Sequence, residues 1–162
     1  MSVRLAYESV GDGPALVLLH PVGLDRSFWP PLLPQAAARQ RVIAVDLAGH
    51  GESPPAPAGR DVAAYAADVL ALLDELGLEA VTLLGLSFGG MIAQELAVTA
   101  PQRVARLIVG ACGTHIPEAA RAAVRARGTA ALTGGMDAVI EATLARWFTA
   151  PFLAAPEVGR VR

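Results

Sequence analysis

The chain has 162 residues, of which 54% are hydrophobic and 17% are charged, with 13 basic residues against 15 acidic ones and a net charge of −2. Soluble domains usually carry roughly 25% charged residues, so this apolar composition excludes a disordered chain. All the basic residues are arginines, spread from Arg4 to Arg162. Without a basic cluster we expect no nucleic-acid partner.

The start of the chain and its uncharged stretches show no targeting or membrane segment. Residues 1–4 lead directly into a strand pattern, without the apolar core of a signal peptide. The longest uncharged stretch, 80–94, contains glycines and hydroxyls and is shorter than the roughly 20 residues that span a bilayer. The single cysteine, Cys112, excludes an internal disulfide and a paired-cysteine metal site. We therefore expect a cytoplasmic protein with no metal and no membrane contact.

The first predicted elements are strands. Apolar and polar residues alternate over 3–8, and residues 11–14, Gly-Asp-Gly-Pro, then force a turn, which predicts an edge hairpin with the run that follows. That run, 15–19, is continuously apolar, as expected of a parallel strand covered on both faces. Similar runs follow at 42–45, 81–84 and 107–109.

Helical patterns separate these runs. The clearest covers 62–76, with Asp61 as its N-cap residue and Gly77 placed to end the helix in a left-handed conformation. Strands that alternate with helices predict the α/β class, with a mostly parallel sheet and helices on both faces. After Thr114 the strand patterns stop, and two helical patterns follow at 117–127 and 136–148.

Residues 85–89, Gly-Leu-Ser-Phe-Gly, fit the G-x-S-x-G nucleophile elbow, with an apolar strand before them and a helix over 91–99 after them. A strand that reverses into a helix forces Ser87 into a strained conformation, for which Gly85 and Gly89 leave room. Phe88 presents its N–H at the helix N-terminus, where an oxyanion is stabilised. We expect Ser87 to be a nucleophile and Phe88 an oxyanion donor. A chance match in a chain with 16 glycines is the alternative.

A second oxyanion donor is predicted in residues 20–23, His-Pro-Val-Gly, at the end of the second apolar run. The N–H of Val22 would face the elbow, and two such donors make an oxyanion hole. For the His20 side chain we favour a buried imidazole that shapes this loop. For Asp46 and His50, in the loop beside the elbow, we favour a turn-forming role over catalysis.

Three segments together, 20–25, 46–53 and 85–92, resemble the α/β-hydrolase superfamily. With the later Gly135-Met136 and the Arg-Trp-Phe-Thr of 146–149, the chain most resembles 3-oxoadipate enol-lactonases. The first three segments are shared with esterases and cofactor-free haloperoxidases. The resemblance implies an α/β-hydrolase core over 1–115, incomplete because its last strands are absent, the start of a helical lid over 116–162, and no cofactor.

The resemblance also implies a chemistry. In such enzymes a serine attacks an ester carbonyl, a histidine takes its proton and an acid orients the histidine. The function expected is hydrolysis of a small ester or lactone, with 3-oxoadipate enol-lactone of aromatic catabolism as the first candidate and a general esterase or haloperoxidase-like hydrolase as the alternative. Trp147 would line the acyl pocket, and Arg146 would pair with a substrate carboxylate. Lid packing for Trp147 and a solvated helix position for Arg146 are the alternatives.

The sequence departs from the family in its triad, which should run Ser, Asp or Glu, then His along the chain. Among the three histidines, only His115 follows Ser87 in the chain. Glu95, the one carboxylate between them, lies two turns into the predicted helix, which carries its side chain away from Ser87. Losing base and acid costs on the order of 10⁶ in turnover, so residues 1–162 alone are expected to be nearly inert. An inert fragment is therefore a further hypothesis.

The same departure leads to an expectation about partners. Beyond the run 107–109 the sheet would expose an unpaired edge, which should bind a complementing C-terminal segment or pair with a second copy. His115 is expected to be an ordinary loop histidine, with a substrate contact as the alternative. Cys112 is expected to be a small buried residue.

Overall fold

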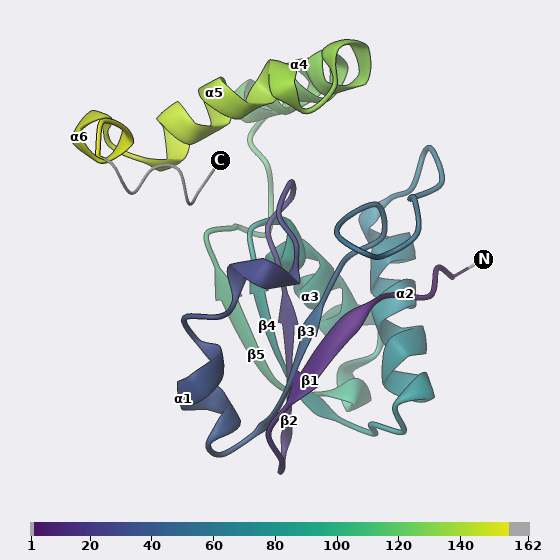
Figure 1. Cartoon of the computed structure of the whole chain (residues 1–162). Helices are drawn as coiled ribbons and strands as arrows, with labels where there is room; N and C mark the ends of the chain where they lie inside the picture. Colours follow the sequence, from purple (N-terminus) through teal and green to yellow (C-terminus); the bar gives the residue numbers. More distant parts are fainter. Residues whose placement is uncertain (1, 156–162) are drawn as a thin grey trace. The chain divides into compact units, whose positions relative to one another are not determined.

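The computed structural model describes residues 2–155 (Figure 1). The chain divides between Thr114 and His115 into two compact units, each of which is described by itself. The assignment of 1–115 to a hydrolase core and of 116–162 to a lid stays a prediction, and residues 156–162 of that lid lie outside the described residues.

The first unit is built on one five-stranded sheet in the order β1-β3-β2-β4-β5. Its strands are β1 (Tyr7–Val10), β2 (Ala15–Leu19), β3 (Arg41–Val45), β4 (Val81–Leu86) and β5 (Val104–Gly110). β1 runs antiparallel to β3, and the other three pairings are parallel. The predicted α/β class and mostly parallel sheet are confirmed.

The predicted edge hairpin is wrong. β1 pairs with β3, with Tyr7 opposite Val45, and β3 lies between β1 and β2. A Cβ on Gly11 would lie within 3.0 Å of backbone at Ala37 and Gln40. This short distance shows that the turn before β2 packs against the chain that leads into β3. The turn therefore carries the chain past β3 instead of folding β2 back onto β1.

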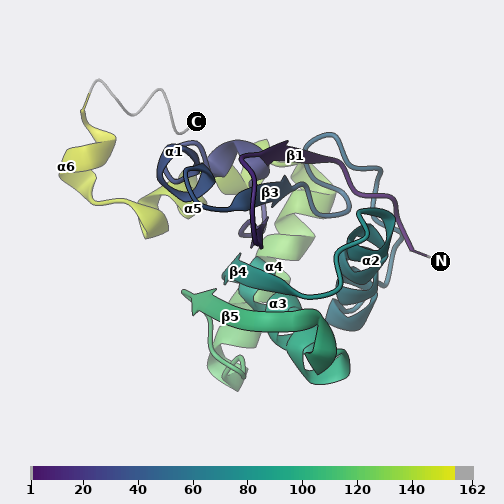
Figure 2. The same ribbon diagram turned by 90° about the horizontal axis from the view of Figure 1, so that it is seen from below.

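Helices cover both faces of the sheet. α2 (Val62–Glu75) and α3 (Phe88–Thr99) lie on one face and the short α1 (Leu33–Ala37) lies on the other (Figures 1 and 2). α2 begins and ends as predicted: the Asp61 carboxylate accepts the Ala64 N–H at 2.9 Å, and Gly77 has φ 64°. Two short 3₁₀ helices, η1 (Arg26–Phe28) and η2 (Pro101–Arg103), complete this unit.

The core follows from the apolar runs. The α2–α3 side buries residues of β2, β3, β4 and both helices, and the α1 side buries a smaller cluster around Trp29. β5 is different, because it is the last strand of the sheet and its apolar side chains are exposed. The exposed fractions are 40% for Leu107, 49% for Ile108 and 37% for Val109. Among residues 2–155, no strand pairs with the outer edge of β5.

The second unit is helical over its described residues. α4 (Glu118–Gly134) packs against α5 (Asp137–Trp147), and α6 (Ala150–Leu153) follows. α4 runs seven residues beyond the predicted end at Arg127. It passes through Gly128 into an alanine-rich stretch and stops at Gly135, whose φ is 71°. Within residues 2–155 no helix combines the length and the apolarity needed to cross a membrane.

Candidate functional site

Ser87 occupies a strained turn between β4 and α3. Its φ is 50° and its ψ is −111°, a conformation that an L-amino acid adopts only when its surroundings impose it. The Ser87 N–H donates to the Gly110 carbonyl at 2.8 Å, and the Ser87 carbonyl accepts the Met91 N–H at 3.0 Å. The turn is thus fixed to β5 on one side and to the first turn of α3 on the other.

The two elbow glycines are required by separate contacts. A Cβ on Gly85 would lie under 3.0 Å from the Gly89 carbonyl, inside the turn itself. A Cβ on Gly89 would lie under 3.0 Å from the carbonyl of Leu19, on the neighbouring strand β2. Both distances are shorter than real Cβ atoms show, so the tight reversal around Ser87 depends on glycine at both positions.

Phe88 is the first residue of α3, so its N–H has no carbonyl partner within the helix and lies at the positive end of the helix dipole. Its ring packs edge-on against Tyr65 of α2, with 5.0 Å between the ring centres. This contact holds the side chain on the α2 side. The N–H of Phe88 follows Ser87 directly at the N-terminus of α3, and its role as an oxyanion donor stays a prediction.

The loop that carries Val22 lies at the same end of the sheet as the elbow. β2 and β4 are parallel neighbours, with Leu19 opposite Gly85. Val22 follows Leu19 by three residues, and Ser87 follows Gly85 by two, so the two segments leave adjacent strand ends. Val22 is 50% exposed. The structure thus brings Val22, Ser87 and Phe88 to one edge, and their catalytic roles stay predictions.

His20 is fully buried and bonded at both ring nitrogens. Its Nδ1 lies 2.7 Å from the Pro21 carbonyl, and its Nε2 accepts the Leu47 N–H at 3.0 Å. Burial lowers the pKa of His20 below its ordinary value, which favours the neutral ring. The predicted role of this side chain in shaping the loop is confirmed.

Asp46 is a buried junction between two loops. One carboxylate oxygen accepts the backbone N–H of Arg26 at 2.7 Å, and the other accepts the Glu52 N–H at 2.9 Å and contacts the Arg26 guanidinium. Arg26 also pairs with the Glu52 side chain at 2.7 Å. A turn-forming role for Asp46 is confirmed. No motif in the sequence indicated that Arg26 is its partner.

Within residues 2–155 the predicted gap in the triad stands. Glu95 lies two turns along α3 from Ser87, and His115 is an exposed residue at the start of the second unit. Arg146 and Trp147 form the end of α5. Trp147 is 39% exposed, and the roles predicted for Arg146 and Trp147 stay predictions.

Cys112 is half-buried, not fully buried as expected. The Gln94 side-chain amide donates to its sulfur at 3.3 Å, and burial raises the pKa of the thiol. A raised pKa disfavours the thiolate, which is the reactive form. The structure of residues 2–155 also contains no group of three or more His, Cys, Asp or Glu residues that could hold a metal ion.

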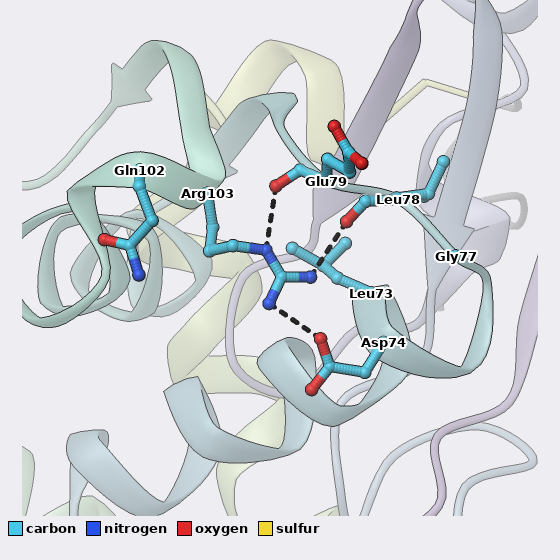
Figure 3. Close-up of a pocket in the computed structure, with 7 residues that line it drawn as sticks. All are labelled: Leu73, Asp74, Gly77, Leu78, Glu79, Gln102 and Arg103. Carbon is cyan, nitrogen blue, oxygen red and sulfur yellow. Dashed lines mark hydrogen bonds and ion pairs between the residues drawn. The ribbon is translucent and has the colours of Figure 1, made fainter.

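A hollow of about 590 Å³ lies at the opposite end of the sheet (Figure 3). Residues 78–79 precede β4 and residues 102–103 precede β5. Arg103 lines this hollow. Its guanidinium donates to the Leu78 and Glu79 carbonyls, each at 2.8 Å, and pairs with Asp74 at 2.7 Å. These contacts leave the Arg103 guanidinium paired within the protein. In addition, α/β sheets bind ligands at the other, carboxyl ends of their strands. We therefore place the candidate site at Ser87.

Comparison with known proteins agrees with this fold. The profile of a family described as "alpha/beta hydrolase fold" matches residues 14–126. Among curated proteins, 3-oxoadipate enol-lactonase 2 of Acinetobacter baylyi is 32% identical over 159 residues, which cover 96% of this chain and 59% of the lactonase.

Solved structures give the same picture. A hydrolase from Pseudomonas aeruginosa superposes with a TM-score of 0.87 at 35% identity, over 98% of this chain and 61% of that one. A thermophilic esterase from Thermogutta terrifontis superposes with a TM-score of 0.84 at 32% identity, over 96% of this chain and 58% of that one. The chain thus spans about three fifths of the length of these relatives.

Proposed function

The chain belongs to the α/β-hydrolase fold family, and from that premise we propose that it carries the nucleophile of a serine hydrolase that cleaves small carboxylic esters or lactones. Ser87 is the nucleophile in this proposal. The backbone N–H groups of Val22 and Phe88 bind the oxyanion. The enol-lactonase and the esterase among its relatives support this reaction class.

The conformation of Ser87 is the single observation that carries the proposal. A non-glycine residue at φ 50° and ψ −111° costs on the order of 1–3 kcal/mol. Such strain is characteristic of functional sites, where it presents a side chain that an ordinary turn would bury. The turn is possible because Gly85 and Gly89, which have no Cβ, let the neighbouring backbone come close on both sides of Ser87.

The chemistry has two stages. The Ser87 oxygen attacks the carbonyl carbon, a C–O bond forms, and the carbonyl electron pair becomes an oxyanion that accepts from Val22 and Phe88. The oxyanion then collapses and the bond between the acyl carbon and the leaving oxygen breaks; that oxygen takes up the proton removed from the serine, which gives an alcohol or enol that departs from an ester and stays tethered to the acyl group in a lactone. Water hydrolyses the acyl-serine in the same way, releasing the acid and restoring Ser87.

The proton transfers require a base, which we propose is supplied by a complementing segment that binds along β5. Among residues 2–155, His115 is the only histidine after Ser87, and Glu95, the one carboxylate between them, lies two turns along α3 from Ser87. The unpaired edge of β5 and its exposed Leu107, Ile108 and Val109 suit a further strand. Native mass spectrometry tests this directly, because a complement would appear as a second polypeptide with the chain.

Ester hydrolysis tests the nucleophile. We expect slow hydrolysis of p-nitrophenyl acetate by the chain, faster when a complement is bound, and loss of the enzymatic rate in Ser87→Ala. Ser9→Ala removes an exposed hydroxyl on β1 and is the matched control. With the complement bound, equal rates for the chain and for Ser87→Ala would contradict the proposal.

For the substrate we propose 3-oxoadipate enol-lactone, whose carboxylate would pair with Arg146 while Trp147 lines the acyl pocket. The similarity to an enol-lactonase over 96% of the chain supports this choice. Arg146→Ala should raise the KM for the anionic lactone and leave the KM for a neutral ester unchanged. An equal rise for both substrates would favour the second candidate, a general esterase, which the similarity to an esterase supports.

A further inference from the structure

Two histidines hold the loop that carries Val22. We call residues 20–24 the oxyanion loop and residues 46–53, which follow β3, the β3 loop. His20 of the oxyanion loop accepts the Leu47 N–H of the β3 loop at 3.0 Å. In the other direction, His50 of the β3 loop accepts the Gly23 N–H of the oxyanion loop at 3.2 Å. Each loop therefore supplies one imidazole that accepts a backbone hydrogen bond from the other loop.

The hydrogen bonds fix the tautomer of both rings. A backbone N–H can only donate, so Nε2 is unprotonated in His20 and in His50. The proton of each neutral ring then lies on Nδ1, which faces a carbonyl in both cases. In His20 this is the Pro21 carbonyl at 2.7 Å, and in His50 it is the Ala48 carbonyl at 3.2 Å. The rings also contact each other edge-on, with 5.0 Å between their centres.

These bonds act on the two peptide planes on either side of Val22. The Pro21 carbonyl, which His20 holds at 2.7 Å and which also accepts the Leu24 N–H at 3.3 Å, belongs to the same trans peptide as the Val22 N–H, so fixing the carbonyl fixes the direction in which that N–H points. The Gly23 N–H, which His50 holds, belongs to the next peptide. Gly23 has φ 80°, and a glycine in that position leaves its flanking peptides free to rotate unless they are bonded.

We propose that His20 and His50 form a clamp that orients the Val22 N–H toward the oxyanion, an inference that rests on the proposed function. Neither side chain touches the reacting atoms, so both are positioning residues. A peptide that rotates about the Val22 bonds would turn the donor away from the substrate. The clamp prevents this rotation by fixing both planes before the substrate arrives, which is the condition for effective oxyanion stabilisation.

His50 is the better residue to change, because it is half-buried whereas His20 is fully buried and its loss would disturb the core. His50→Leu removes the acceptor at similar volume. His50→Gln keeps an oxygen close to the position of Nε2 and can still accept the Gly23 N–H. A role in filling space and a role in holding the peptide therefore give different results for these two variants.

The first readout is the Ser87-dependent hydrolysis of p-nitrophenyl acetate, corrected with Ser87→Ala. Removing a whole oxyanion donor costs about 10²–10³ in kcat, and a misaligned donor should cost less. We expect His50→Leu to lower kcat at least tenfold with KM unchanged, and His50→Gln to recover most of it. An unchanged kcat in His50→Leu would overturn the clamp.

The second readout is the ¹⁵N order parameter of the Val22 N–H. It should fall from about 0.85, typical of rigid backbone, to below about 0.6 in His50→Leu, and stay high in His50→Gln. An unchanged order parameter in His50→Leu would overturn the clamp. So would a lowered order parameter with an unchanged kcat, because the bond would then hold the loop without serving the reaction.

The two readouts also separate the clamp from the proposed function. If hydrolysis by the chain with its complement bound does not exceed that of Ser87→Ala, the proposed function fails, and the order parameter of Val22 still decides whether the clamp exists. If hydrolysis depends on Ser87 but is indifferent to His50, the clamp fails and the proposed function stands.

Discussion

Replacing Ser87 by glycine should make the protein more stable while it removes the proposed nucleophile. The strain at φ 50° and ψ −111° arises because Cβ collides with the backbone in this region, and glycine has no Cβ. The Ser87 side chain makes no capping hydrogen bond to α3. The loss of the hydroxyl should therefore cost the folded state little.

The magnitude follows from two opposing contributions. Relief of the strain contributes about 1–3 kcal/mol to the free energy of unfolding. The extra freedom of glycine in the unfolded chain costs about 0.4–1 kcal/mol. The net expectation for Ser87→Gly is a gain between about 0 and 2.6 kcal/mol, centred near about 1.3 kcal/mol. Ser87→Ala keeps the Cβ and its strain, so its free energy of unfolding should stay within about 0.5 kcal/mol of the wild type.

Urea unfolding followed by circular dichroism measures both variants. We expect a higher midpoint for Ser87→Gly with an unchanged slope, which indicates altered stability and not an altered denatured state. Ala111→Gly is the companion variant, because Ala111 is the other described non-glycine residue with positive φ, at 53°. A midpoint for Ser87→Gly at or below that of Ser87→Ala would refute the argument from strain.

The buried histidine, the elbow and the buried ion pair give three more tests by urea unfolding. Burial lowers the pKa of His20 below 6.5, so its contribution to stability is complete above pH 6.5 and is lost as pH falls through the lower native pKa, by at most about 1.4 kcal/mol per unit. The wild type should therefore lose more stability than His20→Asn between about pH 7.5 and 5.5, and a smaller loss would contradict this. Gly89→Ala, which collides with the backbone of β2, should destabilise by about 1–3 kcal/mol, whereas Gly128→Ala, with open space around its Cβ, should stabilise by up to about 1 kcal/mol; the same sign for both would refute the packing argument. Asp68→Asn should cost about 3–5 kcal/mol because it leaves the buried Arg60 unpaired, and a loss below about 1 kcal/mol would be inconsistent with a buried charge there.

The parts of the fold that could be predicted are those that local patterns determine. The parallel strands follow from continuous apolar runs, and β2 occupies 15–19 as expected. α2 follows from its period, its Asp61 cap and Gly77. The elbow follows from a short motif whose two glycines are required by contacts within a few ångströms of Ser87.

The parts that could not be predicted depend on contacts distant in the sequence. The pairing of β1 with β3 joins residues more than thirty positions apart, as Val10 and Val42 show. α1 spans five residues and contains Pro34, so it is too short to show a helical period. β5 begins three residues before its apolar run, because its pairing with β4 includes the charged Arg106.

The site shows the same division. The sequence identifies Ser87, Val22 and Phe88 as candidates because each belongs to a local motif. The hydrogen bonds between the surrounding loops do not follow from local motifs: Gly23 and His50 lie 27 residues apart, and Arg26 and Asp46 lie 20 apart. Backbone geometry of this kind can be seen only once the strands have brought the loops together.

The two elbow glycines have different neighbours, and this matters to anyone who would graft the turn onto another scaffold. Glycine is required at position 85 because a Cβ there would collide with Gly89 of the same turn, so this requirement applies wherever the five-residue motif is placed. Glycine is required at position 89 because a Cβ there would collide with Leu19 of the adjacent strand. A host protein whose neighbouring strand lies further away would not need glycine at this position. Because the Ser87 N–H also donates to Gly110 of β5, the minimal transplantable unit is strand β4, helix α3 and both neighbouring strands, β2 and β5.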